Sequence, residues 1–276
     1  MPVKVDEPAP HRFSTGKEVR LACRSGSFRG PTSGHCPSQI QTNLLVIPSR
    51  FADDFRGLCK RNPVSCPLIA ESLAPGNTGL SRDVAEDVDV RTDAPGYNIY
   101  KDGKLYAKDV RDCKEWWAED SVAFLIGCSF TFEQALVDAG LTPRHQELER
   151  NVPMYRTNIP LCPSGIFSGT MVVSMRPYKP EKVDAVRAVT RPYIHTHGEP
   201  VAWGPDAVAQ LGIADLLNPE FGEAPVLREG EVPVFWGCGV TPQVVVMSNP
   251  ELIGFSIGHG PGKMLCLDKE IKDILE

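Results

Sequence analysis

Two short segments place a cysteine at the end of an apolar run. The first reads Val-Ala-Phe-Leu-Ile-Gly-Cys-Ser-Phe-Thr over residues 122–131, and the second reads Val-Pro-Val-Phe-Trp-Gly-Cys-Gly-Val-Thr-Pro over 232–242. Each predicts a buried strand that delivers Cys128 or Cys238 to a turn, with a helix beginning just beyond it. Strand ends followed by helix N-termini commonly bind anions in α/β proteins. We therefore expect the pair to mark an active site.

Two interpretations of these cysteines remain open from the sequence. A thiol beside a helix N-terminus can have a lowered pKa, which suits a nucleophile or a proton donor. A small buried residue also fits a tight turn, and Gly239 favours this structural interpretation for Cys238. Ser129 and Thr241 are either helix caps or substrate contacts. Glu133, in the first turn of its helix, is either a solvated acid favoured by the dipole or the proton carrier of the site.

Two arginines end apolar segments and could complete an anion site. Arg156 follows Asn-Val-Pro-Met-Tyr and precedes Thr157, while Arg176 follows Val-Val-Ser-Met. A guanidinium group holds a carboxylate through two parallel hydrogen bonds, so we expect both arginines, with Thr157, to bind a small acid. A surface position is the alternative for each arginine taken alone. Arg91, in Arg-Thr-Asp, is either a turn element or a third clamp.

Three histidines are candidates for acid–base or metal chemistry. His195 and His197 would face the same side of a strand, but no third metal ligand accompanies them, so we expect no metal site. His197 is then a substrate contact that donates a proton, or a turn residue. His259, in Gly-His-Gly-Pro-Gly, is either catalytic on a loop that closes over a ligand or an exposed loop residue. No motif for NAD, flavin or pyridoxal phosphate occurs, so no cofactor is expected.

Composition bounds the class of protein. The chain has 276 residues, 42% of them hydrophobic, and a formal charge of −6, which argues against a nucleic-acid surface. No apolar stretch approaches membrane-spanning length. The nine cysteines include no Cys-x-x-Cys pair and no export signal precedes them, which favours reduced thiols. We expect a cytoplasmic protein, with the mitochondrial matrix as the alternative. Its expected partner is a small carboxylate rather than nucleic acid or membrane, and a homo-oligomer is possible.

Strands alternate with helices along the chain, which predicts an α/β fold with a central sheet flanked by helices and a second, smaller α+β domain. We expect a flexible tail over 1–18, a main α/β domain built from 19–112 and 206–276, and an inserted smaller domain over 113–205. The hydrophobic patterns predict strands at 39–48, 169–175, 232–236 and 263–267, a hairpin about 101–104, a loop at 70–83, and helices after Ser49 and at 110–117, 131–140, 181–189 and 207–217.

These segments together resemble the D-glutamate cyclase family. The resemblance runs in order from about residue 20 to 270 and includes Val-Ser-Met-Arg-Pro at 173–177 and His-Gly-Pro-Gly at 259–262. It also covers Gln-Thr-Asn-Leu, in which Asn43 is expected to contact the substrate. The resemblance implies a two-part α/β fold and the cyclisation of D-glutamate to 5-oxo-D-proline with loss of water.

Cyclisation sets clear chemical demands. The α-amine must be neutral to attack the side-chain carboxyl, whose charge must be masked. Arg156 and Arg176 would neutralise carboxylates, and amides of the two turns would stabilise the tetrahedral oxyanion. Glu133, His259 or Cys128 would carry the proton, and a covalent thioester through Cys128 is the less favoured route. Two alternatives remain: a lyase that removes water or ammonia across a carbon–carbon bond, and a non-catalytic carboxylate binder.

Overall fold

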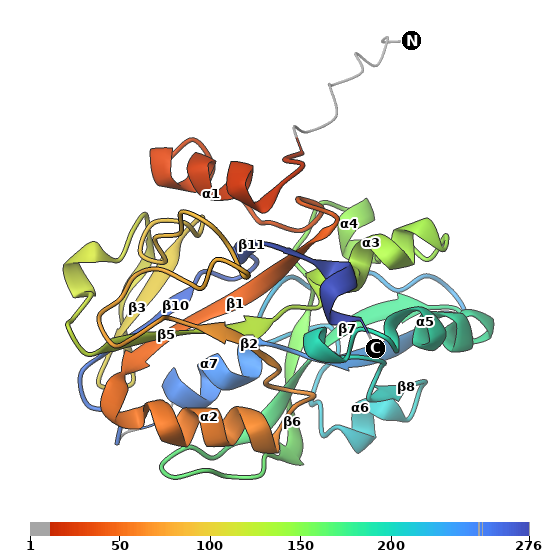
Figure 1. Cartoon of the computed structure of the whole chain (residues 1–276). Helices are drawn as coiled ribbons and strands as arrows, with labels where there is room; N and C mark the ends of the chain where they lie inside the picture. The colour runs from red at the N-terminus through yellow and green to blue at the C-terminus, as the bar shows by residue number, and fades with distance from the viewer. Residues whose placement is uncertain (1–11, 248, 250, 276) are drawn as a thin grey trace, which may run out of the picture.

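The computed structural model describes residues 12–247, 249 and 251–275 (Figure 1). Most of the expected tail lies outside the described residues. From Gly16 the chain forms α1 (Gly16–Ser25), where Thr15 and Glu18 make a reciprocal capping box. Within the described ranges, no helix is long and apolar enough to cross a membrane.

The larger sheet is antiparallel throughout and has the second half of β1 at its centre. Its order is β2-β5-β1-β10-β3-β4, and β11 pairs with the first half of β1. The strands are β1 (Gln39–Pro48), β2 (Leu68–Glu71), β3 (Tyr97–Lys101), β4 (Lys104–Val110), β5 (Ser121–Gly127), β10 (Phe255–His259) and β11 (Leu265–Glu270).

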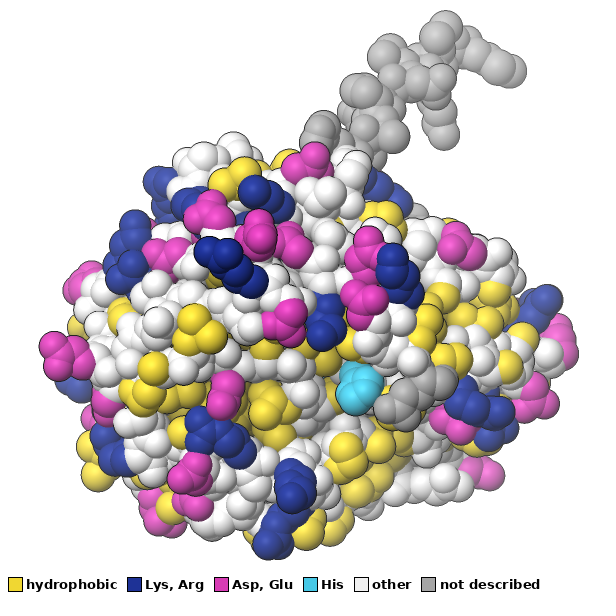
Figure 2. All heavy atoms as spheres, viewed as in Figure 1, with side chains coloured by type: hydrophobic (Ala, Val, Ile, Leu, Met, Phe, Trp, Pro, Cys, Tyr) yellow, Lys and Arg dark blue, Asp and Glu magenta, His cyan; other side chains and the backbone are white. Residues whose placement is uncertain are grey.

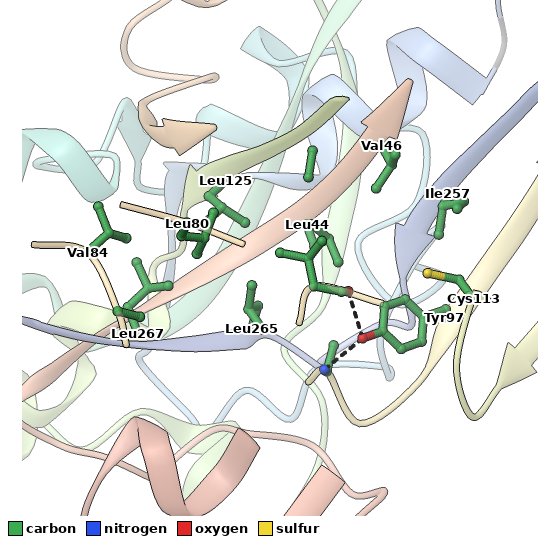
Figure 3. Packing of buried hydrophobic residues seen from close by; sticks show 14 of the residues in the cluster. Leu44, Val46, Leu80, Val84, Tyr97, Cys113, Leu125, Ile257, Leu265 and Leu267 are labelled. Atoms are coloured by element: carbon green, nitrogen blue, oxygen red, sulfur yellow. Dashed lines mark hydrogen bonds between the residues drawn. The ribbon is translucent and has the colours of Figure 1, made fainter. Parts of the chain in front are cut away.

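Strand β1 is buried on both faces, so its side chains supply two separate cores. Leu44 and Val46 face a core closed by the 80–94 segment, in which the Tyr97 hydroxyl donates to Val90 O at 2.9 Å (Figure 3). Leu45 faces the other core, which is covered by α2 (Ala52–Arg61) and α7 (Val240–Met247).

The smaller sheet is also antiparallel, in the order β6-β7-β9-β8. Its strands are β6 (Met154–Pro160), β7 (Thr170–Tyr178), β8 (Ala202–Trp203) and β9 (Val232–Gly237). The helices before or between them are α3 (Phe130–Asp138), α4 (Arg144–Glu147), α5 (Val183–Thr190) and α6 (Ala207–Gln210). Phe132 of α3 and Val186 of α5 pack with Trp236 on one face. Phe235 and Ala207 pack on the other.

The two sheets exchange helices. Helix α3 begins where β5 of the larger sheet ends, yet Phe132 and Leu136 pack on the smaller sheet. Helix α7 begins where β9 of the smaller sheet ends, yet Val245 and Val246 pack on the larger sheet. The two Gly-Cys turns therefore lie where the sheets meet.

The expected fold class is confirmed: a sheet flanked by helices lies beside a second, smaller mixed unit. The domain boundaries stay a prediction; in the structure β5 belongs to the larger sheet and β9 to the smaller. One predicted helix is wrong and another is too long. The 110–117 segment ends β4 and continues as a short 3₁₀ turn at Lys114–Trp116, and the 207–217 helix stops at Gln210 because Gly212 adopts φ +67°.

Candidate active site

A small cavity of about 20 Å³ lies between the two Gly-Cys turns. It has room for one water molecule. Five residues expected from the sequence line it, from both turns and two strands of the larger sheet: Cys128, Ser129, Cys238, Asn43 and His259. The structure thus brings together most of the candidate acid–base groups, although the space is smaller than a glutamate.

The two turns repeat one local design. Thr131 Oγ1 accepts from Gln41 N at 3.2 Å and donates to Gln41 O at 3.4 Å. Thr241 Oγ1 accepts from Val172 N at 2.9 Å and donates to Val172 O at 3.2 Å. In both cases the hydroxyl of the second helix residue attaches the helix N-terminus to a neighbouring strand. Helix α3 follows β5 and is attached to β1, and α7 follows β9 and is attached to β7. The hydroxyl of Thr241 is therefore engaged by β7 and does not line the cavity.

Both cysteines are thiols in this environment. The amide of Phe130 donates to Cys128 Sγ at 3.5 Å, and the amide of Val240 acts on Cys238 in the same way. Burial outweighs these hydrogen bonds: it raises the pKa of Cys128 far above its usual value and that of Cys238 to about 11. Neither sulfur is a thiolate at neutral pH, which disfavours the covalent route.

Asn43 joins the two turns to the histidine. Its Nδ2 donates to Gly127 O at 3.1 Å, and its Oδ1 lies 3.0 Å from His259 Nε2. A Cβ on Gly239 would come within 1.9 Å of Asn43 Nδ2, so only glycine fits there. This contact explains the Gly239 that follows Cys238.

His259 is buried between two carbonyl oxygens. Nδ1 lies 2.7 Å from Gly260 O, and Nε2 faces the Asn43 oxygen. Burial lowers the pKa of His259 to about 4, partly opposed by the Gly260 hydrogen bond, so the resting ring is neutral. A neutral imidazole carries one N–H and satisfies only one of these oxygens, whereas a protonated ring satisfies both. His259 is thus neutral at rest, and each N–H of its protonated form has an acceptor.

Arg176 acts beneath the cavity rather than inside it. Its guanidinium is fully buried, donates to Glu133 Oε1 through Nε at 3.1 Å and to Ser174 Oγ at 3.2 Å, and lies 5.2 Å from the Trp236 ring centroid. It also donates to Ser129 Oγ at 3.0 Å. Ser129 lines the cavity, so Arg176 orients this hydroxyl from below the site.

Glu133 neutralises that arginine. Besides Arg176, it accepts hydrogen bonds from Ser33 at 3.1 Å and Gln146 at 2.7 Å, and its Oε1 lies 3.0 Å from His145 Nε2. Burial alone would raise the pKa of Glu133, but His145 and Arg176 outweigh it and lower the pKa to about 2. The carboxylate is ionised and fully engaged outside the cavity.

Three further predicted contacts lie elsewhere. The Arg156 side chain is exposed, near the Phe221 ring. The expectation that Arg156 and Arg176 line the same carboxylate-binding site is therefore not met. Thr157 donates to Met171 O within the smaller sheet. Arg91 binds the side chain of Asp89 as part of a turn. None of the three lines the cavity.

A larger cavity, of about 680 Å³, lies between α2, the segment that follows it, and the 191–201 segment. Hydrophobic side chains gather in the middle of the face in Figure 2, between α2 and the smaller sheet. His197 forms part of its wall, with Nδ1 2.8 Å from Val64 O. Burial lowers the pKa of His197 to about 4, and its φ of +89° makes it a turn residue. We place the site at the smaller cavity because the thiols, Asn43 and His259 meet there.

Sequence reasoning missed two polar residues. Asn151 lines the cavity, and His145 supports Glu133. No local signal marks either, because each is brought in by long-range packing. In the described part of the chain, no group of three or more His, Cys, Asp and Glu side chains could hold a metal ion.

The fold and site define a two-sheet α/β protein with a buried cavity at two helix N-termini. Residues 122–268 match the family model described as D-glutamate cyclase. A protein named "Putative hydro-lyase" from Azorhizobium caulinodans is 47% identical and covers 95% of this chain and 93% of its own. Relatives with the same description are 49% identical in Bordetella pertussis (92% and 89% covered) and 45% in Schizosaccharomyces pombe (91% and 83%). The chain belongs to the D-glutamate cyclase family, which confirms the resemblance.

Proposed function

We propose that this protein is a lyase that cyclises D-glutamate to 5-oxo-D-proline with loss of water, in the cavity between the two Gly-Cys turns. One observation carries the proposal: two helix N-termini and a neutral, buried histidine face the same space. Family membership supports the lyase class, and the geometry supports a small anionic substrate.

The cavity favours a carboxylate over a neutral group. Helices α3 and α7 both direct their positive ends toward it, and Arg176 orients the Ser129 hydroxyl that lines it. The amides of Phe130 and Val240 now meet the cysteine sulfurs. When a substrate oxygen takes the place of a sulfur, these amides stabilise the negative charge of the tetrahedral intermediate.

His259 moves the protons. Its neutral ring takes a proton from the substrate ammonium, and the resulting amine attacks the side-chain carboxyl to form the C–N bond. The imidazolium then delivers the proton to the departing oxygen. Two protons pass from nitrogen to that oxygen in succession, the C–O bond breaks, and water leaves. Gly260 O keeps its contact with Nδ1 throughout, while Nε2 leaves Asn43 Oδ1 to exchange the proton with the substrate.

Substrate entry requires the cavity to widen. Asn151 is half-buried at the rim and lies against Gly262, on the loop that follows His259. Pro261, which precedes Gly262 in that loop, is exposed. Displacement of this loop would open the cavity toward solvent, past Asn151.

The test is incubation of the purified protein with D- and L-glutamate, other dicarboxylic amino acids and hydroxy acids, followed by mass spectrometry. The expected product is a lactam formed from D-glutamate by loss of one water, without solvent deuterium at the α-carbon. Deuterium at that carbon would instead identify a lyase that abstracts the α-proton. Tight binding with no product after long incubation would identify a non-catalytic binder.

A further inference from the structure

Asn151 carries a buried oxygen without a partner. Its Oδ1 is inaccessible to solvent and accepts no hydrogen bond. Among the buried side-chain nitrogen and oxygen atoms that lack a partner in the described residues, it is the one whose residue lines the site cavity. Buried polar groups are nearly always paired, so this acceptor indicates a place for a ligand donor.

Hydrogen bonds to Glu223 hold the backbone of Asn151, and Gly262 lies against its side chain. The backbone of Asn151 is hydrogen-bonded to Glu223 and is not available to a ligand. Asn151 N donates to Glu223 Oε1 at 3.0 Å, and Asn151 O accepts from Glu223 N at 3.3 Å. The side chain lies against Gly262, where a Cβ would come within 3.2 Å of Oδ1. His259 ends β10, so the expectation of a loop residue is wrong, and Gly262 lies in the loop that follows it. The oxygen therefore lies on the side of the cavity that this loop forms.

We propose that Asn151 Oδ1 binds the α-amino group of the substrate and so makes this cavity selective for an amino acid over the corresponding plain dicarboxylic acid. The inference rests on the proposed function for the identity of the substrate. The two helix N-termini offer donors, which suit carboxylates, whereas Asn151 offers an acceptor, which suits an N–H group. An amine held there lies beside the loop of the histidine that takes its proton.

The experiment compares D-glutamate with glutarate, which has both carboxylates and no amine. Asn151→Leu removes the acceptor at similar size, and Asn151→Asp keeps it. We expect Asn151→Leu to raise the KM for D-glutamate at least tenfold while the inhibition constant of glutarate changes less than twofold. Asn151→Asp should keep D-glutamate binding and weaken glutarate, because a second negative charge then faces the cavity.

Asn218→Leu, the same replacement at an exposed position hydrogen-bonded to Asp215, is the matched control and should leave both values unchanged. Thermal melting of each variant checks that it folds. The proposal is overturned if Asn151→Leu weakens glutarate as much as D-glutamate, or weakens neither. The first result would mean that Asn151 contacts a carboxylate or only shapes the cavity.

Calorimetric titration of both ligands separates this proposal from the proposed function. If wild-type protein binds D-glutamate more tightly than glutarate and Asn151→Leu abolishes the difference, the amine subsite stands even where no lactam forms. If lactam forms and the variant discriminates as well as wild type, the subsite fails and the cyclase stands. If the wild-type protein binds neither D-glutamate nor glutarate, both the amine subsite and the proposed function are contradicted.

Discussion

Burial decides what each residue at the cavity can do. The same cavity keeps Cys128 and Cys238 as thiols and His259 as a neutral base, while an ion pair keeps Glu133 charged just outside it. Residue types alone would allow any of these groups to act as nucleophile or acid. Their environments leave the histidine as the group best suited to move protons near neutral pH.

Replacement of Cys128 tests the covalent route. Because the thiol does not ionise near neutral pH, Cys128→Ser should keep kcat within about fivefold of wild type, well short of the loss expected for a missing nucleophile. Steady-state turnover of D-glutamate measures this. A loss of several orders of magnitude, with a trapped acyl-enzyme in the wild type, would restore the thioester mechanism.

Replacement of His259 tests the base. His259→Gln removes the proton acceptor and should lower kcat about 10²- to 10⁴-fold, the usual contribution of general acid–base catalysis. His35→Gln, which replaces a histidine packed between Phe13 and Phe28 outside the cavity lining, is the control and should keep turnover. Equal activity of both variants would exclude His259 as the base.

Five cavity residues could be proposed from the sequence because the Gly-Cys pattern and the family segments are local signals. Arg176 and Glu133 were expected to act on substrate, but they bind each other across two elements 43 positions apart. Arg156 was expected there too, yet alternation along β6 exposes it. Local spacing does not show which charges pair in the folded chain.

At the scale of elements, strand ends and close backbone contacts hold the site. The sequence predicted the strand at 39–48 and the start of a helix near residue 131, but not how that helix is anchored. The residues Thr131-Phe-Glu-Gln134 fit the pattern of a capping box, in which Thr131 would precede the helix. That prediction is wrong: the helix begins at Phe130, and the Thr131 hydroxyl is hydrogen-bonded to β1. A competing partner from a distant strand overrode the local capping signal.

Gly239 should be intolerant of any side chain. A Cβ there would meet Asn43 Nδ2 at 1.9 Å, so Gly239→Ala must displace the amide that orients His259. We expect at least a tenfold loss of kcat. Gly140→Ala, at φ +69° with open space around it, should cost about 1 kcal/mol of stability and leave kcat unchanged. Full activity of Gly239→Ala would show that Asn43 does not orient the base.

Thr241→Val should loosen one helix from its strand. The change removes the hydroxyl that both accepts from and donates to Val172, and leaves buried backbone groups with one partner fewer. We expect a loss of about 1–3 kcal/mol in the free energy of unfolding, measured by urea denaturation. Thr131→Val removes the equivalent contacts to Gln41 and should behave alike; a neutral result for both would mean that helix packing alone fixes the turns.

For the whole molecule, two buried histidines make stability depend on pH. The pKa values of His197 and His259 fall from 6.5 to about 4 on folding, so the unfolded chain binds more protons between these values. Stability should therefore fall as the pH drops from about 6.5 toward 4, by about 3 kcal/mol for each histidine. Glu133 adds a further loss as the pH falls from 4.5 through about 2.

Urea denaturation between pH 7 and 4.5 measures this dependence. His197→Asn keeps a donor for Val64 O, suits the left-handed backbone and does not titrate, so its curve should be less steep than that of wild type. A wild-type stability that does not change over this range would show that neither histidine is neutral in the folded protein.

The exchange of helices between the sheets has a consequence for synthesis on the ribosome. Strands β10 and β11, which flank β1, are translated after the other strands of the larger sheet, and α7, which packs in the same core as Leu45 and Phe124, comes only shortly before them. A nascent chain that ends before residue 232 would expose part of this hydrophobic core to solvent and would lack the residues that complete the cavity. We expect such truncated products to precipitate or recruit chaperones instead of accumulating as partly active halves.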